Sequence, residues 1–182
     1  MPSSPSSHRL SARLKRARQR LGLARHEIEK LARMAENPAR LDDELLAYSE
    51  TALLEQLRGL AGRDRTVLQG WALGMIELPA AHSELPLAVQ IVHGDTRAGD
   101  ILARTGPAQF ALLLEDCDAE GAETCVRRLA GRLARARPSA FRGIRMAALD
   151  LAEALATPCP LEGLRRRLRA PGLHEASVMK GP

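Results

Sequence analysis

Aromatic residues are nearly absent from this chain of 182 residues, which holds one Trp, one Tyr and two Phe. Proteins that bind single-stranded nucleic acids stack the bases on aromatic side chains, so this scarcity argues against that class of ligand. It also means that the hydrophobic core must be built from Leu, Ala, Val and Ile. Hydrophobic residues reach 45% and charged residues 27% of the chain, which is ordinary for a globular protein.

Other absences exclude further classes. The three cysteines, Cys117, Cys125 and Cys159, are odd in number and form no CxxC pair, so neither a disulfide framework nor a zinc site is indicated. No apolar run approaches the length of a membrane span, and the N-terminus lacks the apolar segment of a signal peptide. There is no phosphate-binding P-loop and no nucleophile elbow. We therefore expect a cytoplasmic protein with no membrane association and no evident catalytic apparatus.

Lysine is scarce as well, and nearly all the positive charge is arginine. Lysine occurs only at Lys15, Lys30 and Lys180, while the chain carries a net charge of +5. Arginine is suited to bidentate contact with phosphates and with guanine edges. A GC-rich genome also enriches a protein in Arg and Ala, and this explains most of the arginines.

The N-terminal third reads as helical. Residues 1–8 are rich in Ser and Pro and are expected to form a disordered tail. After them, apolar residues alternate at spacings of four and three, a heptad ladder that predicts a coiled-coil helix. The ladder consists of Leu10, Leu14, Ala17, Leu21, Ala24, Ile28, Leu31 and Ala35. Asn37-Pro38 ends it, because proline interrupts a helix.

A second helix is predicted from near Leu41 to Gly62. Residues 9–36 hold nine Lys/Arg and three Asp/Glu, whereas residues 40–62 hold two Arg and five Asp/Glu. This opposite charge favours an antiparallel helical hairpin over residues 9–62, whose thin apolar face would pair with a second chain to give a homodimer. The basic helix is read as a face that opposes the acidic one; a nucleic-acid arm is the less favoured alternative.

Residues 66–170 alternate between strand and helix patterns. Strands are predicted at 71–78, 101–105, 109–114 and 143–151, and helices at 85–93, after the N-cap Asp118, and around Leu161–Leu168. The order β-α-β-β-α-β predicts an α+β, ferredoxin-like fold with both crossover helices on one face of the sheet. Residues 171–182 are expected to form a flexible tail.

One segment carries a resemblance. Residues 97–114 read RAGDILARTGPAQFALLL, and they are similar to the pattern RxxDxxxRxGGDEFxxLL of the GGDEF domains, the diguanylate cyclase domains of bacterial signalling. The matching residues are Arg97, Asp100, Arg104, Gly106, Phe110, Leu113 and Leu114. The resemblance is clearest over residues 71–136 and weaker over 137–169. It implies a GGDEF-type fold, often preceded in that family by a dimerising helical stalk.

The departures from the family pattern argue against catalysis. The turn that cradles GTP and supplies carboxylates for Mg²⁺ in the family is here Gly106-Pro107-Ala108-Gln109-Phe110. It has lost both acidic residues, and its proline removes a backbone N–H. Glu77 is the one remaining carboxylate where the family offers a metal ligand, and the segment that holds guanine is missing. We therefore expect no catalytic residue, no metal and no cofactor.

What the resemblance retains is an allosteric motif. In the family, RxxD before the turn is the inhibitory site for cyclic di-GMP, and Arg97 and Asp100 have that spacing. The Arg fork could pair with a guanine edge or a phosphate, and the carboxylate could accept from guanine N–H groups. Arg104 is a third candidate, although a structural role is commoner for such a residue. The alternative for Arg97 and Asp100 is an exposed salt bridge of little energetic weight.

Other arginines are read mainly as surface. Arg127, Arg128 and Arg132 are assigned to the solvated face of their helix, from which one could reach a second ligand molecule. The arginines between 165 and 169 are read as a surface stripe, or as a contact for an acidic partner.

The sequence therefore predicts a non-catalytic cyclic di-GMP receptor that relays binding to an unknown protein partner. The alternative is a ligand-free GGDEF-like adaptor that dimerises and binds other proteins.

Overall fold

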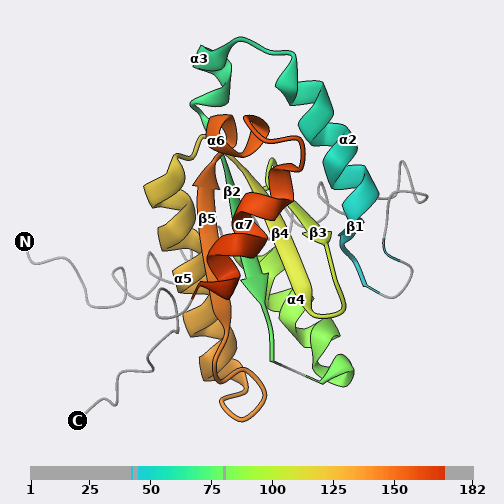
Figure 1. Cartoon of the computed structure of the whole chain (residues 1–182). Helices are drawn as coiled ribbons and strands as arrows, with labels where there is room; N and C mark the ends of the chain where they lie inside the picture. The colour runs from blue at the N-terminus through green and yellow to red at the C-terminus, as the bar shows by residue number, and fades with distance from the viewer. Residues whose placement is uncertain (1–41, 43–44, 80, 171–182) are drawn as a thin grey trace, which may run out of the picture.

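The computed structural model describes residues 42, 45–79 and 81–170 (Figure 1). The predicted tails at 1–8 and 171–182 and the heptad ladder from Leu10 to Ala35 lie outside the described residues, so they stay predictions.

Short strands and helices alternate along the described chain. The elements are β1 (Tyr48–Ser49), α2 (Glu50–Ala61), α3 (Arg65–Leu68), β2 (Trp71–Glu77), η2 (His82–Glu84), α4 (Leu85–Asp95), β3 (Ile101–Arg104), β4 (Gln109–Glu115), α5 (Ala119–Ala136), β5 (Arg145–Asp150), α6 (Leu151–Leu155) and α7 (Pro160–Arg169). The predicted β-α-β-β-α-β order is confirmed by β2, α4, β3, β4, α5 and β5.

The strands form one five-stranded sheet in the order β1-β3-β4-β2-β5. The pairs β3–β4, β4–β2 and β2–β5 are antiparallel, as a ferredoxin-like βαββαβ unit requires, and β1 adds a parallel strand beside β3. The predicted α+β fold class is thus observed, with one short strand that the sequence pattern did not indicate.

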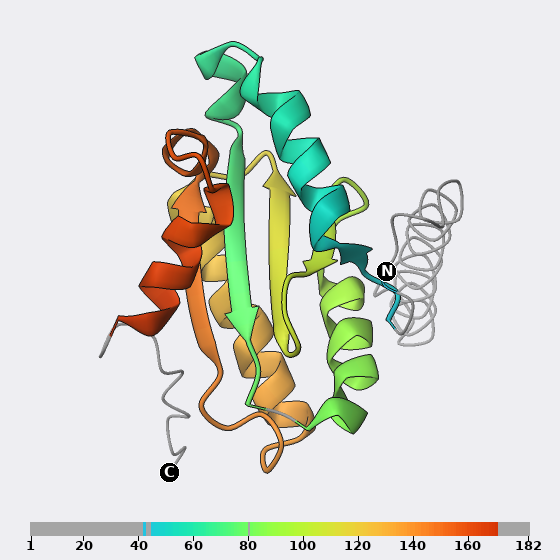
Figure 2. The same cartoon turned by 45° about the vertical axis from the view of Figure 1, so that its right-hand side comes forward.

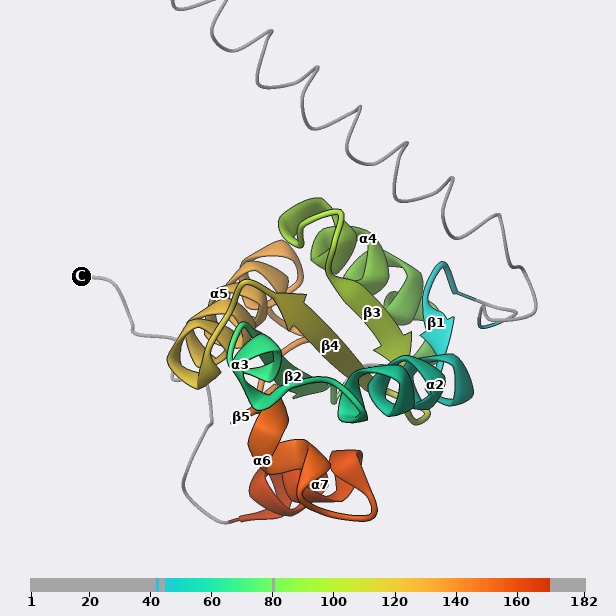
Figure 3. The same ribbon diagram turned by 90° about the horizontal axis from the view of Figure 1, so that it is seen from above.

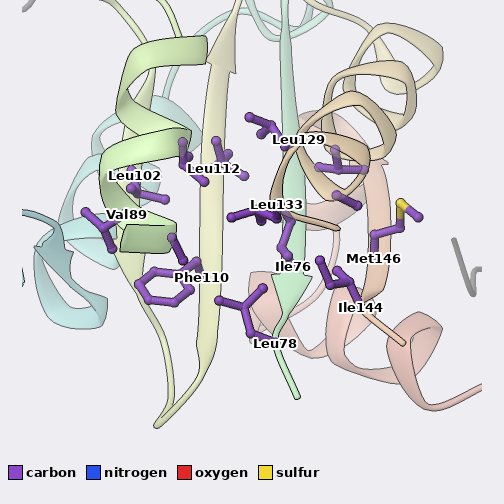
Figure 4. Close-up of a cluster of buried hydrophobic side chains, with 14 of the residues drawn as sticks. Ile76, Leu78, Val89, Leu102, Phe110, Leu112, Leu129, Leu133, Ile144 and Met146 are labelled. Carbon is purple, nitrogen blue, oxygen red and sulfur yellow. The ribbon is translucent and has the colours of Figure 1, made fainter. Parts of the chain in front are cut away.

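Alternation along the central strands divides the core into two layers. On β2, Ala72 and Ile76 point into one cluster, while Leu73 and Met75 point into the other. The first cluster lies under α4 and α5, where Leu129 and Leu133 of α5 meet the sheet (Figure 4). The second lies under α2, α6 and α7, on the opposite face (Figure 3). Both crossover helices therefore cover one face, as predicted.

Helix α5 approaches the sheet closely at Gly74 of β2. A Cβ placed on Gly74 would lie 2.6 Å from Cγ1 of Val126, which no packed core accommodates without a shift. This contact helps to hold the N-terminal half of α5 close to the sheet, and that half forms one wall of the site described below.

The predicted second helix is wrong at its start and in its packing. It begins at Glu50, not near Leu41, because Ser49 caps it by accepting a hydrogen bond from the amide of Ala52 at 3.2 Å. Its buried residues Leu53 and Leu57 pack into the second core layer. The helix lies along the sheet beside β3, with α7 nearer β5 (Figure 2). Residues 50–61 thus pack on the sheet as part of the core of the α+β fold.

Candidate functional site

The RxxD motif forms the turn that joins α4 to β3. Asp100 is only 6% exposed, and its carboxylate accepts hydrogen bonds from the amide of Arg97 at 2.6 Å and from the amide of Glu115 at 3.4 Å. The amide of Asp100 in turn donates to the carbonyl of Arg97 at 3.1 Å. Asp100 therefore shapes the turn and ties it to the end of β4.

Arg97 has a different environment from Asp100. Its side chain is exposed, and its Nη1 lies 3.5 Å from the carbonyl oxygen of Glu115, at the limit of a hydrogen bond. The structure therefore brings the two motif residues together but gives them unequal roles. Arg97 offers a guanidinium to solvent, while Asp100 supports the backbone.

A cavity of about 1340 Å³ opens beside this turn, and we call it the α4–α5 cavity. It is bounded by the end of α4, the RxxD turn, the end of β4 and the first turns of α5. Arg97 and Asp100 line it, together with Arg128 and Arg132 of α5. Its volume exceeds the usual range of small-molecule clefts, roughly 300–1,000 Å³.

The sequence pattern assigns Arg128 and Arg132 mainly to a solvated surface. They lie four residues apart, one turn along α5, so they share a face of the helix. Nη2 of Arg128 donates to the carbonyl oxygen of Asp95 at 3.2 Å, and Nη1 of Arg132 forms an ion pair with the Asp95 carboxylate. Arg127 does not line the cavity and pairs with Glu123 at 2.5 Å. The i,i+4 spacing indicated a shared face, but not that this face borders a cavity.

The cavity also carries negative charge. Six carboxylates line it against three guanidinium groups: Asp95, Asp100, Glu115, Asp116, Asp118 and Glu120. Two of these acids already serve the fold, since Asp100 holds the turn and Asp118 caps α5 by accepting from the amide of Gly121 at 2.8 Å. The predicted N-cap at Asp118 is thereby confirmed. The cavity suits a ligand with both N–H donors and anionic oxygens better than a plain anion.

Glu115 fills the space in front of the RxxD turn. A Cβ placed on Gly99 would clash with Oε2 of Glu115. A glycine has no side chain, so it leaves room for a ligand to approach the backbone. In the structure, the carboxylate of Glu115, an exposed residue, takes that room.

Two thiols complete the lining. Burial raises the pKa of the Cys117 thiol, and the neighbouring Asp118 carboxylate raises it further. Burial also raises the pKa of the Cys125 thiol, against the opposing effect of Arg128. Both side chains are therefore neutral near pH 7 and offer the cavity no further charge.

Arg104 lies at the other end of β3, away from this lining. Its guanidinium pairs with Asp42 at 3.2 Å and donates to the carbonyl oxygens of Gly106 at 3.3 Å and Pro107 at 3.0 Å. Its side chain is only 15% exposed. Arg104 thus connects the turn after β3 to the segment before β1.

The turn at residues 106–110 lies at the end of the sheet opposite the α4–α5 cavity. Glu77, the remaining carboxylate on β2, forms an ion pair with Arg145 at 2.6 Å. Across residues 42, 45–79 and 81–170, no three His, Cys, Asp or Glu side chains group as metal ligands would.

Comparison with known proteins identifies the architecture. No family model matches the sequence, and no curated protein matches it significantly. Among solved structures, the coiled coil and GGDEF domain of DgcB from Caulobacter crescentus, in complex with c-di-GMP, superposes with a TM-score of 0.57, at 13% identity, over 87% of this chain and 92% of that one.

The GGDEF domain of FimX from Pseudomonas aeruginosa gives a TM-score of 0.54, at 18% identity, over 71% of this chain and 88% of that one. A diguanylate cyclase/phosphodiesterase from Caldicellulosiruptor saccharolyticus gives 0.52, at 16% identity, over 74% and 85%.

The fold is the GGDEF fold. At these identities the likeness concerns the fold alone, and it agrees with the architecture expected from residues 97–114. Within the described part of the chain, no helix is both long enough and apolar enough to cross a bilayer.

Proposed function

We propose that this protein is a non-catalytic receptor for cyclic di-GMP, which binds in the α4–α5 cavity and alters contact with a protein partner. The observation that carries the proposal is the meeting of the RxxD pair with Arg128 and Arg132 around one cavity of about 1340 Å³. The resemblance of residues 97–114 to the GGDEF pattern and the c-di-GMP complex of the DgcB neighbour support the choice of ligand.

The chemistry of the ligand fits the mixed charge of the cavity. Cyclic di-GMP carries two phosphates and the O6 and N7 acceptors of guanine, which guanidinium groups pair with in bidentate fashion. It also carries guanine N–H donors, for which carboxylates are acceptors. Arg97 is the group most free to contact the ligand, and Asp100 acts mainly by positioning it.

Three features support the absence of cyclase activity. The turn 106–110 has no acidic residue, and Pro107 offers no backbone N–H. The Glu77 carboxylate is already engaged in an ion pair with Arg145. Phosphoryl transfer depends largely on electrostatic stabilisation by metal ions and cations, and these residues supply little of it.

Equilibrium dialysis with radiolabelled nucleotides tests the proposal. We expect the full chain to retain cyclic di-GMP with near-micromolar affinity, about 8 kcal/mol, and to form no cyclic di-GMP from GTP and Mg²⁺. Turnover above a protein-free control would refute the non-catalytic part. No retention at about 100 µM would refute the receptor part.

A ligand-free adaptor is the second candidate. Six carboxylates and only three guanidinium groups line the cavity. This surplus of negative charge repels a dianionic ligand, and it therefore favours the adaptor. The same dialysis separates the two, since an adaptor retains no nucleotide.

We also propose that the protein is a homodimer. Because α2 packs on the sheet, the seam left for a second chain is the heptad ladder before Asn37. Light scattering should give a dimer for the full chain and a monomer for Leu14→Asp, while Gln19→Asp, off the ladder, stays dimeric. A monomeric full chain would contradict the proposal.

A further inference from the structure

Asp95 is the last residue of α4, and its side chain is in an unusual position. The side chain is 10% exposed and lines the α4–α5 cavity. One carboxylate oxygen, Oδ1, pairs with Arg132, while the other, Oδ2, is buried without a hydrogen-bond partner among the described residues. The backbone carbonyl of Asp95 accepts from Arg128. A single residue thus engages both cavity arginines of α5.

Stability alone does not account for an aspartate here. A carboxylate at the C-terminal end of a helix opposes the helix dipole, and a buried oxygen without a donor retains its desolvation cost. Buried polar atoms left unsatisfied in a native structure call for an explanation. Asp95 combines both costs at the edge of the candidate site.

The two groups that Asp95 engages are those a phosphate would seek. Carboxylates and phosphates both offer oxygens that a guanidinium binds in the same fork geometry. Arg132 is half exposed, at 50%, so it is not confined to its present partner. An anionic ligand in the cavity would therefore compete directly with the Asp95 carboxylate.

We propose that Asp95 is an intramolecular competitor for the ligand: it occupies Arg132 in the free protein, and a phosphate of the ligand displaces it. The proposal rests on the proposed function for the identity of the ligand. Displacement would release the ionic contact between α4 and α5, so that binding loosens one side of the cavity while filling it. The affinity of the wild type is thereby held below what its arginines alone would give.

The chain offers a matched control. Glu123 pairs with Arg127 on the same helix at 2.5 Å, and neither residue lines the cavity. Glu123→Gln therefore removes the carboxylate partner of an α5 arginine without touching the site. Asp95→Asn makes the equivalent change inside it and keeps the side-chain shape.

Calorimetric titration of cyclic di-GMP into the full chain tests the proposal. We expect Asp95→Asn to bind about tenfold more tightly than the wild type, as removal of a charge-assisted competitor implies, and Glu123→Gln to bind as the wild type does. Unchanged or weaker binding by Asp95→Asn, with a wild type that binds, would overturn this proposal and leave the proposed function standing. Binding by Asp95→Asn alone would support it.

A ligand-free measurement covers the case in which neither protein binds, which would refute the proposed function. Phenylglyoxal modifies accessible arginines, and mass spectrometry of the peptides gives the rate at each one. If Asp95 holds Arg132, that arginine should react about threefold faster in Asp95→Asn, since loss of an ion pair frees its side chain. The rate at Arg127 should not change. Equal rates at Arg132 in the two proteins would overturn the proposal independently of any ligand.

Discussion

The carboxylate of Asp100 accepts from two backbone amides, those of Arg97 and Glu115, in a nearly closed environment. Removing it leaves both amides without their acceptor, which costs about 1–3 kcal/mol. We expect Asp100→Ala to lower the free energy of unfolding by about 2 kcal/mol. Arg97→Ala should change it by less than about 0.5 kcal/mol, because the side chain is exposed. Urea denaturation of both variants measures this, and equal stabilities would contradict the positioning role of Asp100.

The cavity thiols permit a test by pH. Burial raises the pKa of Cys117 and of Cys125, so at pH 8 each presents less of the reactive thiolate than an ordinary cysteine does. We expect both to react more slowly with iodoacetamide at pH 8 than the exposed Cys159, and to accelerate as the pH rises past 9. Peptide mass spectrometry resolves the three sites. Alkylation of Cys117 as fast as that of Cys159 at pH 8 would contradict the described environment.

At the scale of elements, α2 is the segment whose packing the sequence could not predict. Its leucines at 53 and 57 indicate one buried face, but an amphipathic stripe does not say which surface covers it. The two-residue strand β1 is too short to produce an alternating pattern, so nothing marked the chain as extended at Tyr48–Ser49.

The sequence also could not predict the polar contact that ties the start of α2 to α7. Nη2 of Arg165 on α7 donates to both carboxylate oxygens of Glu50 at 2.9 Å and to the carbonyl of Thr105 at 3.1 Å. These residues are far apart in the sequence, so only the fold brings them together. By contrast, the strands of the β-α-β-β-α-β unit were predictable because alternation and turn residues are local signals.

The role of α2 in the core gives a stability prediction. Leu57 is 1% exposed among the residues of the second core layer, so Leu57→Ala creates a cavity there. We expect a loss of about 2–5 kcal/mol in the free energy of unfolding. Leu46→Ala is the control, because that side chain is 57% exposed and should lose less than about 0.5 kcal/mol. Guanidinium denaturation measures both variants. A loss below about 0.5 kcal/mol for Leu57→Ala would contradict the packing of α2 on the sheet and would favour a separate helical hairpin.

At the scale of the whole molecule, the candidate site is assembled from segments that the sequence presents separately. The resemblance to a family motif identifies the RxxD turn. The structure adds Asp95, and it brings Arg128 and Arg132, which the sequence pattern assigns mainly to a solvated surface, to the same cavity as that turn. Arg104 is the opposite case: it matches the family motif in register, yet it pairs with Asp42 and does not line the cavity. A pattern along the chain indicates which residues belong to a motif, but not which surfaces meet.

The most direct test of a receptor site in the α4–α5 cavity is calorimetric titration of cyclic di-GMP into the full chain, its Arg97→Ala and Arg97→Lys variants, and Arg127→Ala as a control outside the cavity. The account predicts saturable binding to the wild type and to Arg127→Ala. Arg97→Ala should bind about ten- to a hundredfold more weakly, because a charge-assisted hydrogen bond contributes roughly 1.5–3 kcal/mol. Arg97→Lys should also be weakened, since a point charge cannot make the bidentate pair. Binding that is unchanged in Arg97→Ala, or absent from the wild type, would contradict it.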